Sequence, residues 1–241
     1  MLITSLDNDR IKRYIKLKDR KYRKKEKKFI IEGEHLVHEA YKEGIVEELI
    51  LEENEKIDIS LPTIYVTYEI MKKISDMDSP SKVMAICKIK ENKIIGDKIL
   101  LLDDIQDPGN LGTIIRSAKA FNIDTIVLSP NTVDMYNSKV LRSTQGMIFH
   151  SNIVVQDLKE AIINLKEKQI PIYGTRVDNG IDVTTLDKRE KYALVMGNEG
   201  AGVSKEILDM CDKYLYIKMN SDVESLNVGV ATSILLYELN K

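Results

Sequence analysis

The C-terminal part of the sequence alternates short apolar runs with helical stretches, and this alternation restricts the possible folds more than any other feature. From residue 98 onward the apolar runs are KILLLDDI, TIVLS, IPIYGTRV, YALVMG and YLYIKM. The helical stretches among them are NLGTIIRSAKAFN, DLKEAIINLKEK, SKEILDMC and LNVGVATSILLYELN. Nearly continuous apolar strands that alternate with helices predict an α/β fold whose parallel sheet is covered on both faces. Ligands of such sheets bind beyond the carboxyl ends of the strands, so the residues that follow each strand are the candidates for a functional site.

The first 90 residues have a different pattern, with shorter elements and a modest apolar content. Strands are expected at FIIEG, VEELILEE, TIYVT and KVMAICKIK, and helices at EHLVHEAYKEG and EIMKKISD. This pattern predicts a small mixed α/β unit. The polar stretch KENKIIGDK then separates this unit from the parallel sheet, either as a hinge or as a plain loop. We therefore expect two domains, residues 1–93 and residues 94–241.

Positive charge is concentrated near the N-terminus. The whole chain has a formal net charge of −2, but residues 10–28 contain 12 lysines and arginines against Asp19 and Glu26. Such a segment either faces a polyanion such as RNA or forms a solvated helix face. Tyr14 and Tyr22 lie among the basic residues and could stack on bases. The candidate RNA-binding residues are Arg20, Arg23, Lys24, Lys25, Lys27 and Lys28.

Membrane, secreted and metal-dependent proteins are disfavoured by simple features of the sequence. No apolar run approaches about 18 residues and the N-terminus has no apolar core, so we expect no membrane span, no signal peptide and a cytoplasmic location. Cys87 and Cys211 lie in different segments, and we interpret both as buried thiols. His35 and His38 do not match the metal-binding pattern H-E-x-x-H, and no metal site is expected.

The segment DDIQDPGNLGTIIRSAKAF follows the first strand of the predicted parallel sheet. Asp107-Pro108-Gly109 predicts a turn, and Asn110 is placed to cap the helix that follows. Arg116 lies within this helix among apolar neighbours. An arginine in that setting needs either a carboxylate partner or a cleft, and the segment alone leaves both possibilities open.

Two further segments follow later strands and carry polar residues. In LVMGNEGAGVS, the glycines have the order G-x-x-G-x-G, which differs from the dinucleotide-binding pattern G-x-G-x-x-G. Glu199 in this loop would repel a phosphate, so the loop is either a ligand site of another kind or a tight turn. In YIKMNSDVESLNVGVATSILLYEL, Ser225 and Asn227 stand at the start of a long apolar helix, where capping is the simplest role for Ser225.

Taken together, these segments resemble the signature motifs of the SpoU/TrmH family of RNA ribose methyltransferases. DPGNLGTIIRSA is similar to the first motif, LVMGNEGAG to the second and SLNVGVATSILLYE to the third, and VLRSTQGMIFH also looks like a family segment. The motifs keep the family's order and spacing over residues 98–241. The N-terminal segments SLDNDRIK, KLKDRKYR and FIIEGEHLVHEA are similar to a ribosomal-protein-like substrate-binding domain. The chain departs from the family at Lys218, where Pro is usual, and at Gly229, where Ser is usual.

The resemblance implies a trefoil knot in the C-terminal domain and a homodimer formed through that domain. It also implies S-adenosylmethionine as the cofactor, with no metal. The catalytic residues that it implies are Arg116, Asn110, Glu199, Ser225 and Asn227. The cofactor-binding residues that it implies are Gly197, Ile217 and Leu226, together with Thr175 and Gly174.

The implied reaction transfers a methyl group to a ribose 2′-hydroxyl of structured RNA, with 23S ribosomal RNA as the expected substrate. Arg116 would stabilise the developing alkoxide, because a guanidinium group is a cation with no site that accepts a proton. Asn110 and Glu199 would orient Arg116 or the ribose. The alternatives are a tRNA ribose methyltransferase, a non-catalytic RNA-binding or ribosome-assembly protein, and a nucleotide-binding oxidoreductase. The glycine order argues against the oxidoreductase.

Overall fold

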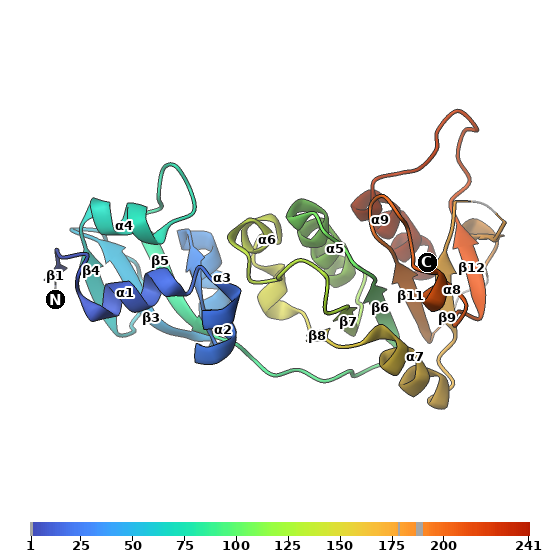
Figure 1. The fold of residues 1–241 in the computed structure, drawn as a ribbon, viewed down its shortest axis with the longest axis horizontal. Coiled ribbons are helices and arrows are strands. Elements are labelled where there is room, and N and C mark those ends of the chain that lie inside the picture. The colour runs from blue at the N-terminus through green and yellow to red at the C-terminus, as the bar shows by residue number, and fades with distance from the viewer. Residues whose placement is uncertain (1, 178, 187–189) are drawn as a thin grey trace. The chain divides into compact units, whose positions relative to one another are not determined.

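The computed structural model describes residues 2–177, 179–186 and 190–241, which pack into two compact units (Figure 1). The N-terminal unit contains the described residues up to Lys90 together with residues 134–149. The C-terminal unit contains residues 91–133 and the described residues from His150 onward. The sequence suggested a single division at residues 93 and 94. By packing, the chain divides at Lys90 and again on either side of the segment 134–149.

The N-terminal unit is built on a five-stranded mixed sheet with the order β1-β4-β3-β5-β2. The strands are β1 (Leu2–Ile3), β2 (Lys28–Glu32), β3 (Val46–Glu52), β4 (Thr63–Val66) and β5 (Val83–Lys88). The helices before residue 90 are α1 (Asp9–Lys16), α2 (Arg20–Glu26), α3 (Glu34–Lys42) and α4 (Tyr68–Ile74). β5 runs antiparallel to both neighbours, and β1, β4 and β3 pair in parallel. Residues of α1 and α4, including Ile11 and Met71, form one hydrophobic cluster with residues of the sheet. The strands and helices expected for this region are confirmed.

The basic segment forms α1 and α2, which are short helices with side-chain caps. Asn8 accepts a hydrogen bond from the backbone of Arg10 at the start of α1, and Asp19 does the same for Lys21 at the start of α2. Arg23 is turned into the unit, with its side chain 9% exposed. Its guanidinium group donates to the carbonyl oxygens of Leu17 and Lys18 and pairs with Asp134. The segment is therefore folded against the unit and is only partly a solvated face.

Residues 134–149 come from the middle of the motif-bearing region but pack against β2. They contain α6 (Ser138–Ser143) and the start of a short 3-10 helix (Met147–His150). The ring of Tyr136 lies 4.4 Å from that of Phe29 between centroids, and the ring of Phe149 lies 6.3 Å from it. Asp134 supplies the carboxylate for Arg23 at 2.6 Å. Aromatic packing and a mostly buried ion pair thus attach this segment to the N-terminal unit.

The C-terminal unit contains a seven-stranded sheet with the order β10-β12-β9-β11-β6-β7-β8, and its described strand pairs are all parallel. The strands are β6 (Lys98–Leu102), β7 (Thr125–Leu128), β8 (Ile153–Val155), β9 (Ile172–Thr175), β10 (Ile181–Asp182), β11 (Tyr192–Met196) and β12 (Lys213–Tyr216). The helices are α5 (Pro108–Ala120), α7 (Leu158–Glu167), α8 (Lys205–Leu208) and α9 (Val228–Leu239), with a short 3-10 helix at Val183–Thr185. The predicted parallel α/β sheet is confirmed. β8 and β10 were not expected from the sequence because both are very short.

Both faces of this sheet are buried. Residues of α7 and α8 form a hydrophobic cluster with Ile99, Leu101 and Val195 on one face. Leu100 and Leu194 are also fully buried. Successive side chains of a strand point to opposite faces, so the second face is covered as well. This is the arrangement that nearly continuous apolar strands predict.

α5 and α9 lie against each other and carry two of the three motif segments. The hydroxyl groups of Ser117 and Ser233 are 2.7 Å apart across this contact. A Cβ atom at Gly229 would lie 3.1 Å from the side chain of Thr113, so glycine at this position allows close approach of the two helices. The caps differ from the expected ones. Asp107 caps α5 in place of Asn110, because Pro108 begins the helix. Asn227 caps α9 in place of Ser225.

In the described ranges, no helix is both long and apolar enough to cross a membrane. Cys87 is buried, as predicted, whereas Cys211 is only half-buried. Burial raises the pKa of the Cys87 thiol well above its usual range and that of Cys211 to about 11. Neither thiol is therefore activated as a nucleophile.

Candidate active site

The polar residues of the three motifs meet at the carboxyl ends of β6, β11 and β12. The side-chain amide of Asn227 donates to Asn110 Oδ1 at 2.8 Å. The side-chain amide of Asn110 in turn donates to the Glu199 carboxylate at 3.0 Å. These three residues are far apart in the sequence and come from three separate post-strand segments. The structure therefore brings Asn110, Glu199 and Asn227 of the expected catalytic set into one hydrogen-bonded chain.

Glu199 is held as an anion at the end of this chain. Besides the amide of Asn110, its carboxylate accepts the backbone N–H groups of Asp107 at 2.9 Å and of Gln106 at 3.1 Å. Partial burial opposes ionisation of this carboxyl group. The hydrogen bonds outweigh that effect, so the pKa of Glu199 lies below its usual range. A fixed negative charge stands beside the N-terminal turn of α5, where it also interacts favourably with the helix dipole.

The glycine-containing loop after β11 closes as a tight turn. Asn198 and Gly202 exchange backbone hydrogen bonds, and Asn198 Oδ1 accepts the N–H groups of Gly200 and Ala201. A Cβ atom at Gly197 would lie 2.0 Å from the backbone nitrogen of Val203. Glycine is needed at position 197 so that the loop can fold back on itself. The tight-turn interpretation of this loop is therefore correct, and the same turn also forms one wall of a cavity.

A cavity of about 400 Å³ lies beside the loop, between the segments that follow β9, β11 and β12. Of the expected cofactor-binding residues, Gly197, Ile217, Leu226 and Thr175 line it. Gly174 does not. It is buried, and a Cβ atom at this position would lie 3.0 Å from Cys211 Sγ. Further lining residues that sequence reasoning missed include Arg176, Met196, Leu215, Met219, Val228 and Leu235. Most of these residues are apolar and lie close in the sequence to the expected ones. That closeness was the signal that could have identified them.

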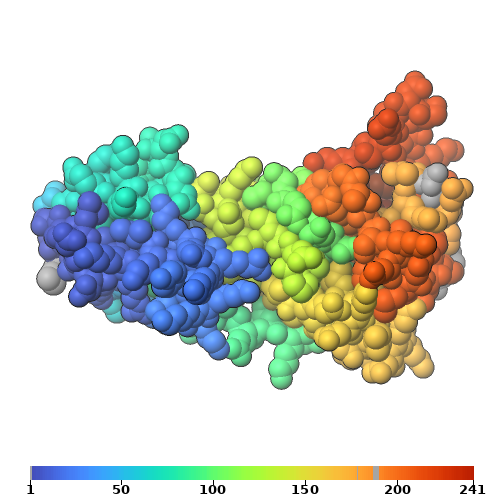
Figure 2. Space-filling model, in the orientation of Figure 1, coloured from blue at the N-terminus to red at the C-terminus, as the bar shows by residue number. Residues whose placement is uncertain are grey.

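The cavity fits a purine nucleoside with a polar tail. Apolar side chains from β12 and α9 form its walls. The backbone N–H and C=O groups of Ile217 and Leu226 take part in no backbone hydrogen bond with the described part of the chain. They are available to a ligand whose edge carries donors and acceptors, such as adenine. The segment from residue 217 to residue 227 projects from the C-terminal unit beyond this cavity (Figures 1 and 2).

Arg116 and Ser225, the remaining members of the expected catalytic set, lie outside the hydrogen-bonded chain. Ser225 lines the cavity and is exposed. Arg116 is exposed on α5, and its guanidinium group forms no ion pair or hydrogen bond with any residue that the structure describes. The sequence allowed either a carboxylate partner or a cleft for Arg116. No carboxylate partner is present among the described residues. Arg116 is free to meet an external anion.

The candidate RNA-binding residues fall into two groups. Lys24, Lys25 and Lys27 are exposed on and after α2. Arg23 is buried, and Lys28 pairs with Glu47 at 2.5 Å. Arg20 is half-buried, with a buried Nε. Direct contact with a polyanion therefore suits the exposed lysines, whereas the guanidinium group of Arg23 is held in place by Leu17, Lys18 and Asp134.

Comparisons with known proteins agree over nearly the whole chain. Residues 97–237 match the SpoU rRNA Methylase family, and residues 8–85 match the MRM3-like substrate binding domain. The chain is 40% identical over 98% of both lengths to a Bacillus subtilis protein named 23S rRNA (guanosine(2553)-2′-O)-methyltransferase. A solved structure titled as a putative RNA methyltransferase of the TrmH family from Porphyromonas gingivalis has a TM-score of 0.88, 29% identity and 98% coverage of both chains. An AdoMet-bound rRNA methyltransferase from Sinorhizobium meliloti has a TM-score of 0.86 and 28% identity, covering 99% of this chain and 97% of that one.

Proposed function

The chain belongs to the SpoU rRNA methylase family, and we propose that it transfers a methyl group from S-adenosylmethionine to a ribose 2′-hydroxyl of 23S ribosomal RNA. The observation that carries this proposal is the set of hydrogen bonds that links Asn227 and Asn110 to Glu199, which lines a cavity of about 400 Å³. The full-length relative from Bacillus subtilis supports 23S ribosomal RNA as the substrate. The guanosine equivalent to the one in that protein's name is the first nucleotide to test.

The residues of the site would act on the 2′-hydroxyl. Bound S-adenosylmethionine would supply the methyl group from a sulfonium centre, which leaves as a neutral thioether. Arg116 would stabilise the negative charge that develops on the ribose oxygen, since its guanidinium group remains protonated and has no acceptor among the described residues. The hydroxyl proton would be released to solvent as the methyl group is transferred. Asn110 would position the ribose, with its amide held by Glu199 and Asn227. Ser225 would complete the polar rim of the cavity.

Gly197, Ile217, Leu226 and Thr175 would hold the cofactor. Ile217 and Leu226 offer apolar walls and free backbone groups to the adenine ring. Thr175 is anchored by donating its hydroxyl to Val195 O at 2.9 Å. Gly174 would contribute indirectly, because its lack of a side chain leaves room for Cys211.

Three further properties are part of this proposal. The C-terminal unit would carry the trefoil knot of its family. It would form a homodimer through α9, on which Val230 and Tyr237 are 47% and 52% exposed. Large exposed apolar side chains on an otherwise apolar helix favour a protein partner. The protein would act in the cytoplasm, where its ribosomal RNA substrate is found. Light scattering at several concentrations tests the dimer, since a monomer at all of them would contradict it.

The test of the reaction is the Arg116→Ala variant, with Arg116→Lys as the matched control that keeps the positive charge. Affinity for S-adenosylmethionine should persist in both variants, because Arg116 does not line the cavity. Methyl transfer to a 23S ribosomal RNA fragment should fall by about 100-fold or more in Arg116→Ala, the usual effect of removing one oxyanion-stabilising group. Unchanged transfer would remove Arg116 from the site. Transfer to a tRNA in place of the 23S fragment would favour the tRNA alternative, and absence of S-adenosylmethionine binding would favour a non-catalytic protein.

A further inference from the structure

The N-terminal unit contains a second, smaller cavity that the proposed reaction does not use. It has a volume of about 60 Å³ and lies between the end of α1, β2, the end of α4 and residues 136–142. All of its lining residues belong to the N-terminal unit. The charged residues in its lining are Lys18, Arg23, Glu32, Asp76 and Arg142.

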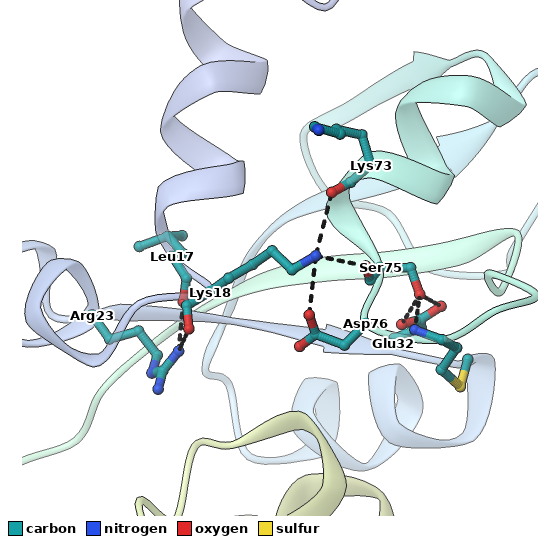
Figure 3. Close-up of polar contacts among 8 residues, drawn as sticks. Leu17, Lys18, Arg23, Glu32, Lys73, Ser75 and Asp76 are labelled. Atoms are coloured by element: carbon teal, nitrogen blue, oxygen red, sulfur yellow. Dashed lines mark hydrogen bonds and ion pairs between the residues drawn. The ribbon is translucent and has the colours of Figure 1, made fainter.

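Three of these charged groups are already occupied by internal partners. The Glu32 carboxylate accepts the Ser75 hydroxyl at 2.8 Å and the backbone N–H of Ser81 at 2.7 Å. Lys18 pairs with Asp76 at 3.0 Å and donates to the Ser75 carbonyl oxygen at 2.7 Å. Figure 3 shows the contacts of Lys18 with Ser75 and Asp76 and of Glu32 with Ser75. Lys18 therefore balances the charge of Asp76, and hydrogen bonds from Ser75 and Ser81 stabilise the charge of Glu32.

The two arginines retain unused donors. Arg23 Nε and Arg142 Nη1 are both buried atoms without a hydrogen-bond partner. The other guanidinium nitrogens of Arg23 are fixed by Leu17, Lys18 and Asp134, so its position is set before any ligand arrives. Arg142 differs, because its side chain forms no hydrogen bond or ion pair with the part of the chain that the structure describes. A buried N–H group of a cation without an acceptor is costly, so such groups are usually satisfied by water or by a ligand.

We propose that this cavity binds one phosphate group of the RNA backbone between Arg23 and Arg142. This inference rests on the proposed function, because it assigns a binding site to the same RNA. The cavity is much smaller than the one in the C-terminal unit, and its size suits a single phosphate group. Guanidinium groups match phosphate oxygens in shape and charge. Lys21, Lys24 and Lys25 are exposed on the neighbouring α2 and provide a positive flank for the adjoining phosphates.

The experiment compares Arg142→Ala and Arg142→Lys with Lys72→Ala. Lys72 is an exposed lysine of α4 in the same unit and lies outside the cavity, so its variant removes one positive charge without touching the site. Binding to a 23S ribosomal RNA fragment is measured at several salt concentrations, together with S-adenosylmethionine affinity and thermal unfolding. Arg142→Ala should weaken RNA binding about tenfold and lower the salt slope by about 0.7–0.9, the contribution of one phosphate contact. Arg142→Lys should lie between Arg142→Ala and the wild type, because it keeps the charge and loses the planar guanidinium. Cofactor affinity and unfolding temperature should not change.

Two outcomes separate this inference from the proposed function. If the wild-type protein methylates the fragment but Arg142→Ala binds it as well as Lys72→Ala does, the cavity holds only water and the inference is wrong. If the wild-type protein neither binds S-adenosylmethionine nor methylates RNA, the proposed function itself fails. A loss of RNA affinity that leaves the salt slope unchanged would also overturn the inference, because it would show that no phosphate contact had been removed.

Discussion

Replacing Arg176 with alanine is expected to weaken binding of S-adenosylmethionine while sparing binding of its nucleoside part. Arg176 follows β9 and lines the large cavity. Its guanidinium carbon lies 4.7 Å from the centroid of the Tyr214 ring. No described residue pairs with this guanidinium group through a hydrogen bond or a salt bridge. Among the described residues that line the cavity, Arg176 is the only lysine or arginine. The carboxylate of the cofactor's amino-acid part is therefore its natural partner.

The size of the effect follows from the exposure of Arg176. A hydrogen bond to a charged group contributes about 1.5–3 kcal/mol, and solvent screening at an exposed arginine favours the lower end of that range. A loss of about 1.5 kcal/mol corresponds to a roughly tenfold increase in Kd. The contact with Tyr214 does not require the hydrogen-bonding edge of the guanidinium group, so it can persist in the complex. Arg176→Lys should show a smaller loss, because lysine keeps the charge without the planar pair of donors.

Calorimetric titration can separate the carboxylate contact from general damage to the cavity. The wild type, Arg176→Ala and Arg176→Lys are each titrated with S-adenosylmethionine and with 5′-methylthioadenosine, which lacks the amino-acid part. Arg176→Ala should bind S-adenosylmethionine about tenfold more weakly and 5′-methylthioadenosine with unchanged affinity. An equal loss for both ligands, or no loss for either, would refute the assignment.

Three further predictions concern stability. The pKa of Glu199 is lowered in the folded protein, so its hydrogen bonds add stability above about pH 4.3, its ordinary pKa, and this stability is lost as the pH falls through the folded pKa. Urea unfolding between pH 3 and pH 7 should show a higher free energy of unfolding for the wild type than for Glu199→Gln at neutral pH, and this difference should become smaller in acid. A difference in unfolding free energy that does not depend on pH would contradict this prediction. Gly197→Ala should cost about 1–3 kcal/mol and weaken cofactor binding, because its Cβ would lie 2.0 Å from Val203 N; unchanged unfolding and titration curves would show that the turn adapts. Tyr136→Ala should destabilise the N-terminal unit by about 2–3 kcal/mol through loss of packing on Phe29; an unchanged unfolding midpoint would show that residues 134–149 are not anchored there.

Local patterns in the sequence were sufficient to predict most of the helices and strands and the position of the candidate active site. Apolar runs of strand length, alternating with helical periodicity, predicted β6, β7, β9, β11 and β12 and the parallel sheet that they form. The carboxyl ends of parallel strands lie at one edge of the sheet, so the residues after them could be expected to meet. The motif resemblance added the identities of Asn110, Glu199 and Asn227. Both kinds of signal lie within short stretches of chain, where backbone geometry and side-chain periodicity act directly.

The sequence by itself thus determined the two kinds of fold and the concentration of positive charge up to residue 28, and it pointed to four residues that line the large cavity. Only the tertiary structure decided which partner each polar group receives. Asn110 donates a hydrogen bond to Glu199, which lies 89 positions away in the sequence, and Arg23 forms an ion pair with Asp134. Residues 134–149 pack as part of the N-terminal unit. These pairings depend on where segments that are distant in the sequence lie in the folded structure. The physical reason is that a charged or amide group accepts any suitable partner within about 3 Å, and proximity at that scale is set by the packing of the whole core.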